Sequence, residues 1–180
     1  YQKEHSLTSG DIENLKSCEI ENIVPIFLFK QPELLVSLCG VILRTIYRLV
    51  DHRVFLKQPY TATEVPFTHI SLQELFGEHS ILNAVCGNAE ALKKAAIGFA
   101  GEEFIHDEED CLDGLCELIN SINGMFASKM SSEDMDLDMK VPQYHLNAGT
   151  LKADSLLCIP VVVFDQELTF VLSLDTPYSI

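Results

Sequence analysis

The segment 107–130 carries carboxylates and a carboxamide at a spacing that suits chemistry on one face of a helix. The residues are Asp113, Glu117, Asn120 and Gly124. They fall within about 60° of one another when successive residues are placed about 100° apart around a helix axis. A carboxylate can pair with a cation, a carboxamide can donate and accept hydrogen bonds at once, and a glycine lets another backbone approach closely. An ordinary solvent-exposed helix face has the same spacing, because exposed Glu and Asn are common. Spacing alone favours this second interpretation over a functional site.

The opposite face of this segment is apolar. It consists of Leu115, Ile119, Ile122 and Phe126, a continuous stripe that is typical of a helix packed on a sheet. The acidic run 107–110 suits the start of such a helix, because negative charge is favourable at a helix N-terminus. A cation site is the alternative for this run, but it lacks the glycine and the alternating spacing of a calcium loop.

The remaining elements must position this helix. Further helices are expected over 32–50 and 89–99, and strands over 61–72, 79–86, 142–147, 156–164 and 167–174. In the last of these, Leu168, Phe170, Leu172 and Leu174 alternate with other residues, which is the period of a strand with one face on a core. The last two strands would form a hairpin over Asp165 and Gln166. The pattern predicts an α+β fold, with long α-helices packed on an antiparallel β-sheet.

The length suits one domain with an appendage. The 180 residues are 47% hydrophobic and 22% charged, a composition that can bury a core. Residues 1–31 begin with a polar stretch and continue into the run Ile23–Phe29, which contains Pro25 and is too short for a core helix. We expect 1–31 to be an arm that packs on the domain or on another chain, and 32–180 to be the domain.

The charge balance limits the kinds of partner. Twelve Lys and Arg against 27 Asp and Glu give a net charge of −15, which argues against nucleic acid and favours a basic or metal-bearing protein surface. The longest apolar stretches, 34–43 and 158–164, are far shorter than the roughly 20 residues of a membrane-spanning helix. We therefore expect a soluble chain without a membrane span.

The cysteines and histidines suggest structural roles. The six cysteines include no CxxC pair, so we expect buried, reduced thiols and no zinc site. His69, His79 and His145 have no nucleophile pattern beside them and are expected to be structural.

The polar face of 107–130 resembles the signature of the CheC/CheX/FliY family of chemotaxis phosphatases. The residues that carry the resemblance are Asp113-x-x-x-Glu117-x-x-Asn120, followed by Gly124 and by Pro142 at the start of an expected strand. The flanks also agree, since the segments 82–87 and 89–98 are similar to the strand and small-residue helix that precede the motif in that family. In order of elements the resemblance covers about residues 32–176.

Two features depart from the family pattern. The 21 residues between Asn120 and Pro142 are one fewer than the family has, which a loop after the helix can absorb. Members similar to CheC carry a second motif on their first long helix, where this chain has Val41 and Arg44. The chain therefore resembles the single-site, CheX-like branch, and its first 31 residues have no counterpart in the resemblance.

The resemblance implies hydrolysis of the aspartyl phosphate of a response-regulator receiver domain such as CheY. In that scheme Glu117 pairs with the active-site lysine of the receiver and Asn120 orients the attacking water. Asp113 and Gly124 would contribute to binding the partner. The Mg²⁺ ion belongs to the receiver, so neither metal nor cofactor is expected on this chain, and the expected location is cytoplasmic.

Two other interpretations remain open at this point. The chain could be a non-catalytic interaction module on the same fold, similar to the flagellar switch proteins, which binds a receiver without hydrolysing anything. It could also be an unrelated acidic α+β domain without a role in phosphosignalling.

A homodimer is expected for two reasons. CheX-like proteins pair through sheet edges, and the run 159–164 is hydrophobic on both faces, which would favour aggregation in an open edge strand. Pro160 cannot donate to a strand ladder, so we expect it at an edge or a bulge.

Overall fold

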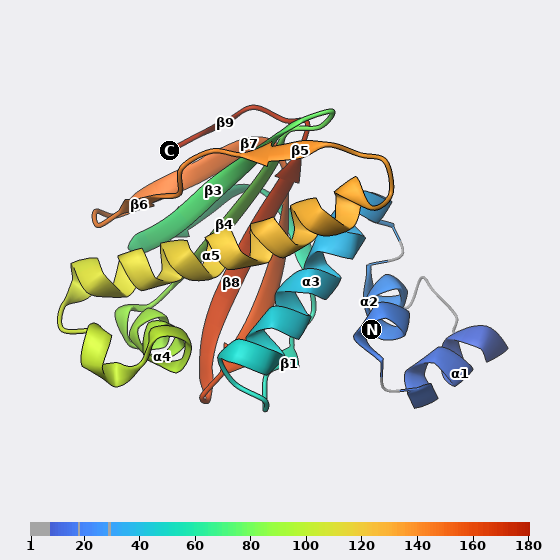
Figure 1. Ribbon diagram of the computed structural model, residues 1–180, viewed down its shortest axis with the longest axis horizontal. Helices are drawn as coiled ribbons and strands as arrows, with labels where there is room; N and C mark the ends of the chain where they lie inside the picture. Colours follow the sequence, from blue (N-terminus) through green and yellow to red (C-terminus); the bar gives the residue numbers. More distant parts are fainter. Residues whose placement is uncertain (1–7, 18, 29) are drawn as a thin grey trace.

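The computed structural model describes residues 8–17, 19–28 and 30–180. In this part of the chain, helices pack on one face of a curled antiparallel sheet (Figure 1). The expected α+β fold is confirmed. The helices are α1 (Ser9–Ser17), α2 (Ile20–Phe27), α3 (Glu33–Leu49), α4 (Ala89–Ala100), the 3-10 turn η1 (Glu102–Phe104) and α5 (Glu108–Ser131). The strands are β1 (Phe55–Leu56), β2 (Tyr60–Phe67), β3 (His69–Gly77), β4 (Ile81–Gly87), β5 (Leu137–Met139), β6 (Gln143–His145), β7 (Gly149–Val163), β8 (Gln166–Leu174) and β9 (Tyr178–Ser179).

The long strand β7 organises the sheet. It pairs with β1 and β2 along one edge and with β8 and β9 along the other. From β8 the sheet continues through β4 to β3, whose outer edge carries the short strands β5 and β6. Helix α5 lies across this β3–β4 part of the sheet (Figure 1), so the strands beneath it can reach its side chains.

The chain covers both faces of its sheet. Ile159, Val161 and Val163 of β7 belong to the apolar core beneath the helices. The alternating residues Leu156 and Cys158 belong to a second core inside the curl of the sheet. This packing on both faces explains why the sequence of β7 shows no alternation of apolar and polar residues.

Pro160 lies within a paired strand, so its expected place at an edge or a bulge is wrong. It pairs with Thr169 of β8, and its carbonyl oxygen accepts a hydrogen bond of 2.9 Å from the N–H of Lys57. In an antiparallel strand the nitrogen and the carbonyl of one residue point to the same side. The missing N–H therefore faces the connection 57–59 between β1 and β2, where the ladder is already interrupted.

Three strand expectations needed correction. Strand β7 begins at Gly149, seven residues before the expected start at 156. The segment 61–72 is not one strand, because the chain bends at Thr68 between β2 and β3, which pair with different neighbours. The hairpin between β7 and β8 turns one residue earlier than expected, at Phe164 and Asp165, whose φ angles are 47° and 63°. Two positive φ angles in a row are the geometry of a tight hairpin turn. The N–H of Phe164 donates to Oδ2 of Asp51 at 2.7 Å, which holds this turn against the end of α3.

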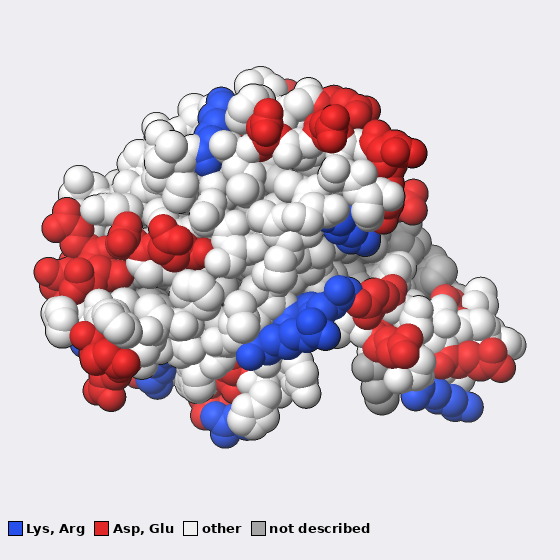
Figure 2. All heavy atoms as spheres, in the orientation of Figure 1, with Lys and Arg blue, Asp and Glu red and all other residues white. Residues whose placement is uncertain are grey.

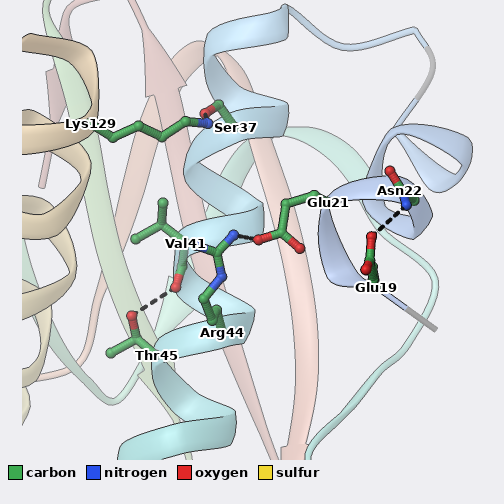
Figure 3. A network of polar contacts seen from close by, with 8 residues as sticks. All are labelled: Glu19, Glu21, Asn22, Ser37, Val41, Arg44, Thr45 and Lys129. Carbon is green, nitrogen blue, oxygen red and sulfur yellow. Dashed lines mark hydrogen bonds and ion pairs between the residues drawn. The ribbon is translucent and has the colours of Figure 1, made fainter. Parts of the chain in front are cut away.

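The arm packs on the domain and contains two helices, α1 and α2, that the sequence did not predict. Pro25 lies inside α2, where it removes a helical hydrogen bond. Burial of Val24 and Ile26 offsets this cost, and Val24 joins the core cluster that includes α3. Glu21 of α2 also forms an ion pair with Arg44 of α3 (Figure 3). The boundary between arm and domain at residues 31 and 32 stays a prediction.

Candidate functional site

Helix α5 presents the two faces that its sequence predicts. Leu115, Ile119, Ile122 and Phe126 are fully buried. Asp113 and Glu117 are exposed on the other side, and Asn120 and Gly124 are partly exposed. The acidic run is the start of the helix, where the carboxylate of Asp107 accepts a hydrogen bond of 2.9 Å from the N–H of Asp110.

The side chain of Asn120 is held from below by β3. Its Oδ1 accepts a hydrogen bond of 2.9 Å from Nε2 of Gln73, and the same Nε2 donates to the carbonyl oxygen of Lys140 at 2.7 Å. Gln73 was not among the residues predicted from the sequence, and it is only 1% exposed. A glutamine in the middle of an apolar strand was the signal that could have found it.

Two further amides continue this contact into the protein. Nδ2 of Asn123 donates to Oε1 of Gln73 at 2.9 Å, and Nδ2 of Asn83 donates to Oδ1 of Asn123 at 2.8 Å. Asn83 and Asn123 are both fully buried. We call Asn83, Asn123, Gln73 and Asn120 the amide chain. It joins β4, α5 and β3 beneath the polar face.

An irregular edge strand provides the Lys140 carbonyl group that Gln73 of the amide chain contacts. Leu75 pairs with Met139 and Leu72 with Gln143, so three residues of the edge lie opposite two of β3. The extra residue interrupts the ladder as a β-bulge does. Pro142 lies within this interruption and has no N–H to pair. The carbonyl of Lys140 is thereby left to accept from the Gln73 side chain.

The carboxylates of Asp113 and Glu117 are exposed to solvent. Among the described residues, neither Asp113 nor Glu117 forms an ion pair, so each is available to a cation from outside. Figure 2 shows acidic side chains gathered over the N-terminal part of α5. Their field also reaches inward: the pKa of the Cys116 thiol is raised to about 11, chiefly by burial and also by Asp113 and Glu117.

Gly124 lies beside a small apolar surface. A Cβ placed on Gly124 would meet only Cε of Met139 within 4 Å, at 3.8 Å. Met139 is exposed, and so are Met125, next to Gly124 in the sequence, and Val141, two residues after Met139; Val141 is 81% exposed. We call Met125, Met139 and Val141 the apolar rim. A rim of this kind beside polar groups suits contact with a protein surface.

The first long helix has no second site. At the positions where a second motif would require Glu and Asn, Val41 is buried and Arg44 pairs with Glu21 of the arm (Figure 3). Ser37 accepts a hydrogen bond of 2.6 Å from Nζ of Lys129 of α5. These positions of α3 therefore connect it to α2 and α5.

Five of the cysteines are buried, and His79 and His69 lie near carboxylates of the chain. Cys39, Cys86, Cys111, Cys116 and Cys158 are free and buried, and Cys18 lies outside the described residues. His79 contacts the carboxylate of Asp175 at 2.7 Å, and His69 lies 3.7 Å from that of Glu108. Within the ranges that the structure describes, no three His, Cys, Asp or Glu side chains are grouped to hold a metal ion. In the same ranges no helix has the length and hydropathy to cross a bilayer.

Comparison with known proteins decides the family. Residues 69–164 match the family model described as chemotaxis phosphatase CheX. This stretch contains β3, β4, α4 and α5, and it is more than half of the chain. The chain belongs to the CheX family. No curated protein sequence matches it.

Solved structures show the same fold at low sequence identity. The chemotaxis protein CheX of Desulfovibrio desulfuricans matches with a TM-score of 0.68 at 15% identity, over 79% of this chain and 99% of that one. The CheX–CheY–BeF3–Mg²⁺ complex of Borrelia burgdorferi matches with a TM-score of 0.63 at 15% identity, over 81% and 99%. FliY of Thermotoga maritima matches with a TM-score of 0.50 at 13% identity, over 93% and 91%.

The likeness to FliY extends beyond the domain. Residues 32–180 are 149 of the 180 residues, so a match over 93% of the chain includes part of the arm.

Proposed function

We propose that this CheX-family chain removes the phosphoryl group from the aspartyl phosphate of a CheY-like receiver domain. Glu117 pairs with the active-site lysine of the receiver, and Asn120 orients the attacking water. The observation that carries the proposal is the arrangement of these two side chains on one face of α5, with Glu117 exposed and Asn120 held by Gln73. The similarity to a fold solved as a CheX–CheY complex supports the choice of partner.

The reaction needs positioning more than activation. The oxygen of water forms a bond to phosphorus while the bond from phosphorus to the aspartyl oxygen breaks, which yields inorganic phosphate and a free carboxylate. The water gives up its proton to phosphate or solvent. An acyl phosphate has a good leaving group, so holding the water in line and neutralising charge supply most of the catalysis. A carboxamide suits this task because it accepts a hydrogen bond without titrating.

Charge favours a receiver as the partner. Receiver active sites carry a lysine and a Mg²⁺ ion, which are attracted by the exposed carboxylates of Asp113 and Glu117. Asp113 acts through this potential, and Gly124 leaves room for the backbone of the partner. The apolar rim supplies the uncharged part of the contact.

Phosphate release tests the proposal. Receiver domains phosphorylated with a small phosphodonor should lose phosphate faster with the wild-type chain than alone. Glu117→Ala and Asn120→Ala should each remove most of this acceleration, whereas Glu133→Ala, an exposed carboxylate beyond the end of α5, should not. Binding of receivers without any acceleration would favour the interaction module instead.

We also propose a homodimer, which one of the two original reasons no longer supports. The apolar run of β7 is covered within the chain on both faces and is paired along its edges with β8 on one side and with β1 and Lys57 on the other, so it no longer argues for a partner subunit. The outer edge of β2 remains a place where a second copy could pair. Light scattering at micromolar concentration tests this, because a mass near 20.1 kDa would mean a monomer.

A further inference from the structure

We propose that Gln73 is the positioning residue that fixes which atom of the Asn120 amide faces the reaction. The inference rests on the proposed function, since it gives the water-orienting group a support. Gln73 lies on β3, is almost completely buried, and contacts Asn120, Asn123 and the Lys140 carbonyl. It does not itself face the partner, so it acts only through Asn120.

The backbone determines the direction of the whole amide chain. A carbonyl oxygen can only accept, so the Gln73 atom at 2.7 Å from the Lys140 carbonyl must be the donor Nε2. The second proton of that nitrogen points to Asn120, whose facing atom must be the acceptor Oδ1. A backbone carbonyl group thus determines which side of the Asn120 amide carries the oxygen and which carries the nitrogen.

The inner half of the chain holds Gln73 in this orientation. Its Oε1 accepts from Nδ2 of Asn123, whose Oδ1 accepts from Nδ2 of Asn83. If the amide of Gln73 were rotated by 180°, its oxygen would face the oxygen of Lys140, and its NH2 group would face that of Asn123. Gln73 and Asn123 are almost completely buried, so two like contacts in their place would be unfavourable.

The orientation of the Asn120 amide determines which of its atoms are available to the water and the phosphoryl group. Gln73 uses one lone pair of Oδ1 of Asn120, which leaves the second lone pair to accept a proton of the attacking water. No described protein group accepts a hydrogen bond from Nδ2 of Asn120, so this donor is free for a phosphoryl oxygen. An Asn120 without this support would rotate among several orientations, of which a minority would hold the water in line.

Substitution by a side chain of similar length separates positioning from packing. Gln73→Met fills much of the same space but provides no donor. We expect kcat for receiver dephosphorylation to fall by roughly 10–100-fold, as for other misplaced catalytic groups, while KM and the affinity for beryllofluoride-treated receiver change by less than about twofold.

Ser71 provides a matched control on the same strand. Its Oγ donates to the carbonyl oxygen of Leu112 of α5 at 2.9 Å, and it is fully buried. Ser71→Ala thus removes a hydrogen bond between β3 and α5 that does not involve Asn120. We expect it to lower the melting temperature without the drop in kcat. Equal losses of kcat in Ser71→Ala and Gln73→Met would overturn the positioning role.

A measurement on the unmodified chain keeps the inference testable if Gln73→Met does not fold. Nuclear magnetic resonance of the free protein should show one orientation of the Asn120 side chain, with nuclear Overhauser contacts between its neighbourhood and the Nε2 protons of Gln73. Averaging of Asn120 over several rotamers would overturn the inference. This measurement needs no activity, so it stays informative if the wild-type chain releases no phosphate and the proposed function fails.

Discussion

A Cβ atom added to Gly124 would lie 3.8 Å from Cε of Met139, an ordinary van der Waals distance, and would meet nothing closer in the described chain. The fold itself therefore does not require glycine at this position of α5. Glycine is about 1 kcal/mol less favourable than alanine in a helix interior, so its presence here has a cost that the chain does not recover internally.

Gly124→Ala should consequently separate stability from binding. We expect the free energy of unfolding to stay equal or to rise by up to about 1 kcal/mol. We expect the affinity for a beryllofluoride-treated receiver to fall, because the added methyl group would separate the partner backbone from α5. Titration calorimetry together with urea unfolding checks both effects. Unchanged affinity would remove Gly124 from the binding surface.

Substitutions of Glu117 and of Asn120 should change different kinetic constants. An interaction present in both the ground state and the transition state affects KM, whereas one needed only at the reacting centre affects kcat. Glu117→Gln should raise KM by roughly tenfold, equivalent to about 1.4 kcal/mol, with the largest effect at low ionic strength. Asn120→Ala should still bind the receiver but lose turnover. The reverse pattern would mean that the two roles are exchanged.

The sequence predicted α5 well because one helix contains the whole pattern. The apolar stripe and the polar face follow from a period of 3.6 residues, and no distant residue changes them. The amide chain could not be derived in this way, since Gln73 and Asn83 come from different strands that lie beside α5 only in the folded chain. Besides Gln73 within its apolar strand, the sequence offered one more sign in Asn123, a polar residue whose angle around α5 falls beside the apolar stripe.

The errors in the fold have the same origin. The sequence excluded a helix at α2 because of Pro25, but packing on α3 outweighs the lost hydrogen bond. It joined β2 and β3 into one strand because propensity does not show which neighbour each half pairs with. In both places tertiary contacts overrule the local preference.

Substitutions on the buried face of α5 should lower the free energy of unfolding, whereas substitutions on its polar face should leave it nearly unchanged. Leu115 is fully buried in the core beneath the helices, so Leu115→Ala should lower the free energy of unfolding by about 2–5 kcal/mol. Glu117→Ala, two positions away and exposed, should change it by less than about 0.5 kcal/mol. Urea unfolding of both variants measures the difference. A large loss of stability in Glu117→Ala would mean that the exposed side of α5 is packed against something in solution.

Asp51 should make the stability of the β7–β8 hairpin depend on pH. Burial alone would raise the pKa of its carboxyl group, but hydrogen bonds from the backbone N–H groups of Phe164 at 2.7 Å and Arg53 at 2.9 Å, with the charge of Arg53, lower it overall. A lowered pKa in the folded state means that the carboxylate stabilises the fold above the unfolded value of about 3.9 and loses this contribution as the pH falls through the folded pKa.

Asp51→Asn should therefore cost about 1–3 kcal/mol at pH 7, and the difference from wild type should shrink below about pH 4. Asp165→Asn, exposed in the same hairpin turn, is the control and should change the free energy of unfolding at pH 7 by less than about 0.5 kcal/mol. A gap between wild type and Asp51→Asn that stays constant down to the acid limit of folding would mean that the carboxylate charge does not hold the turn.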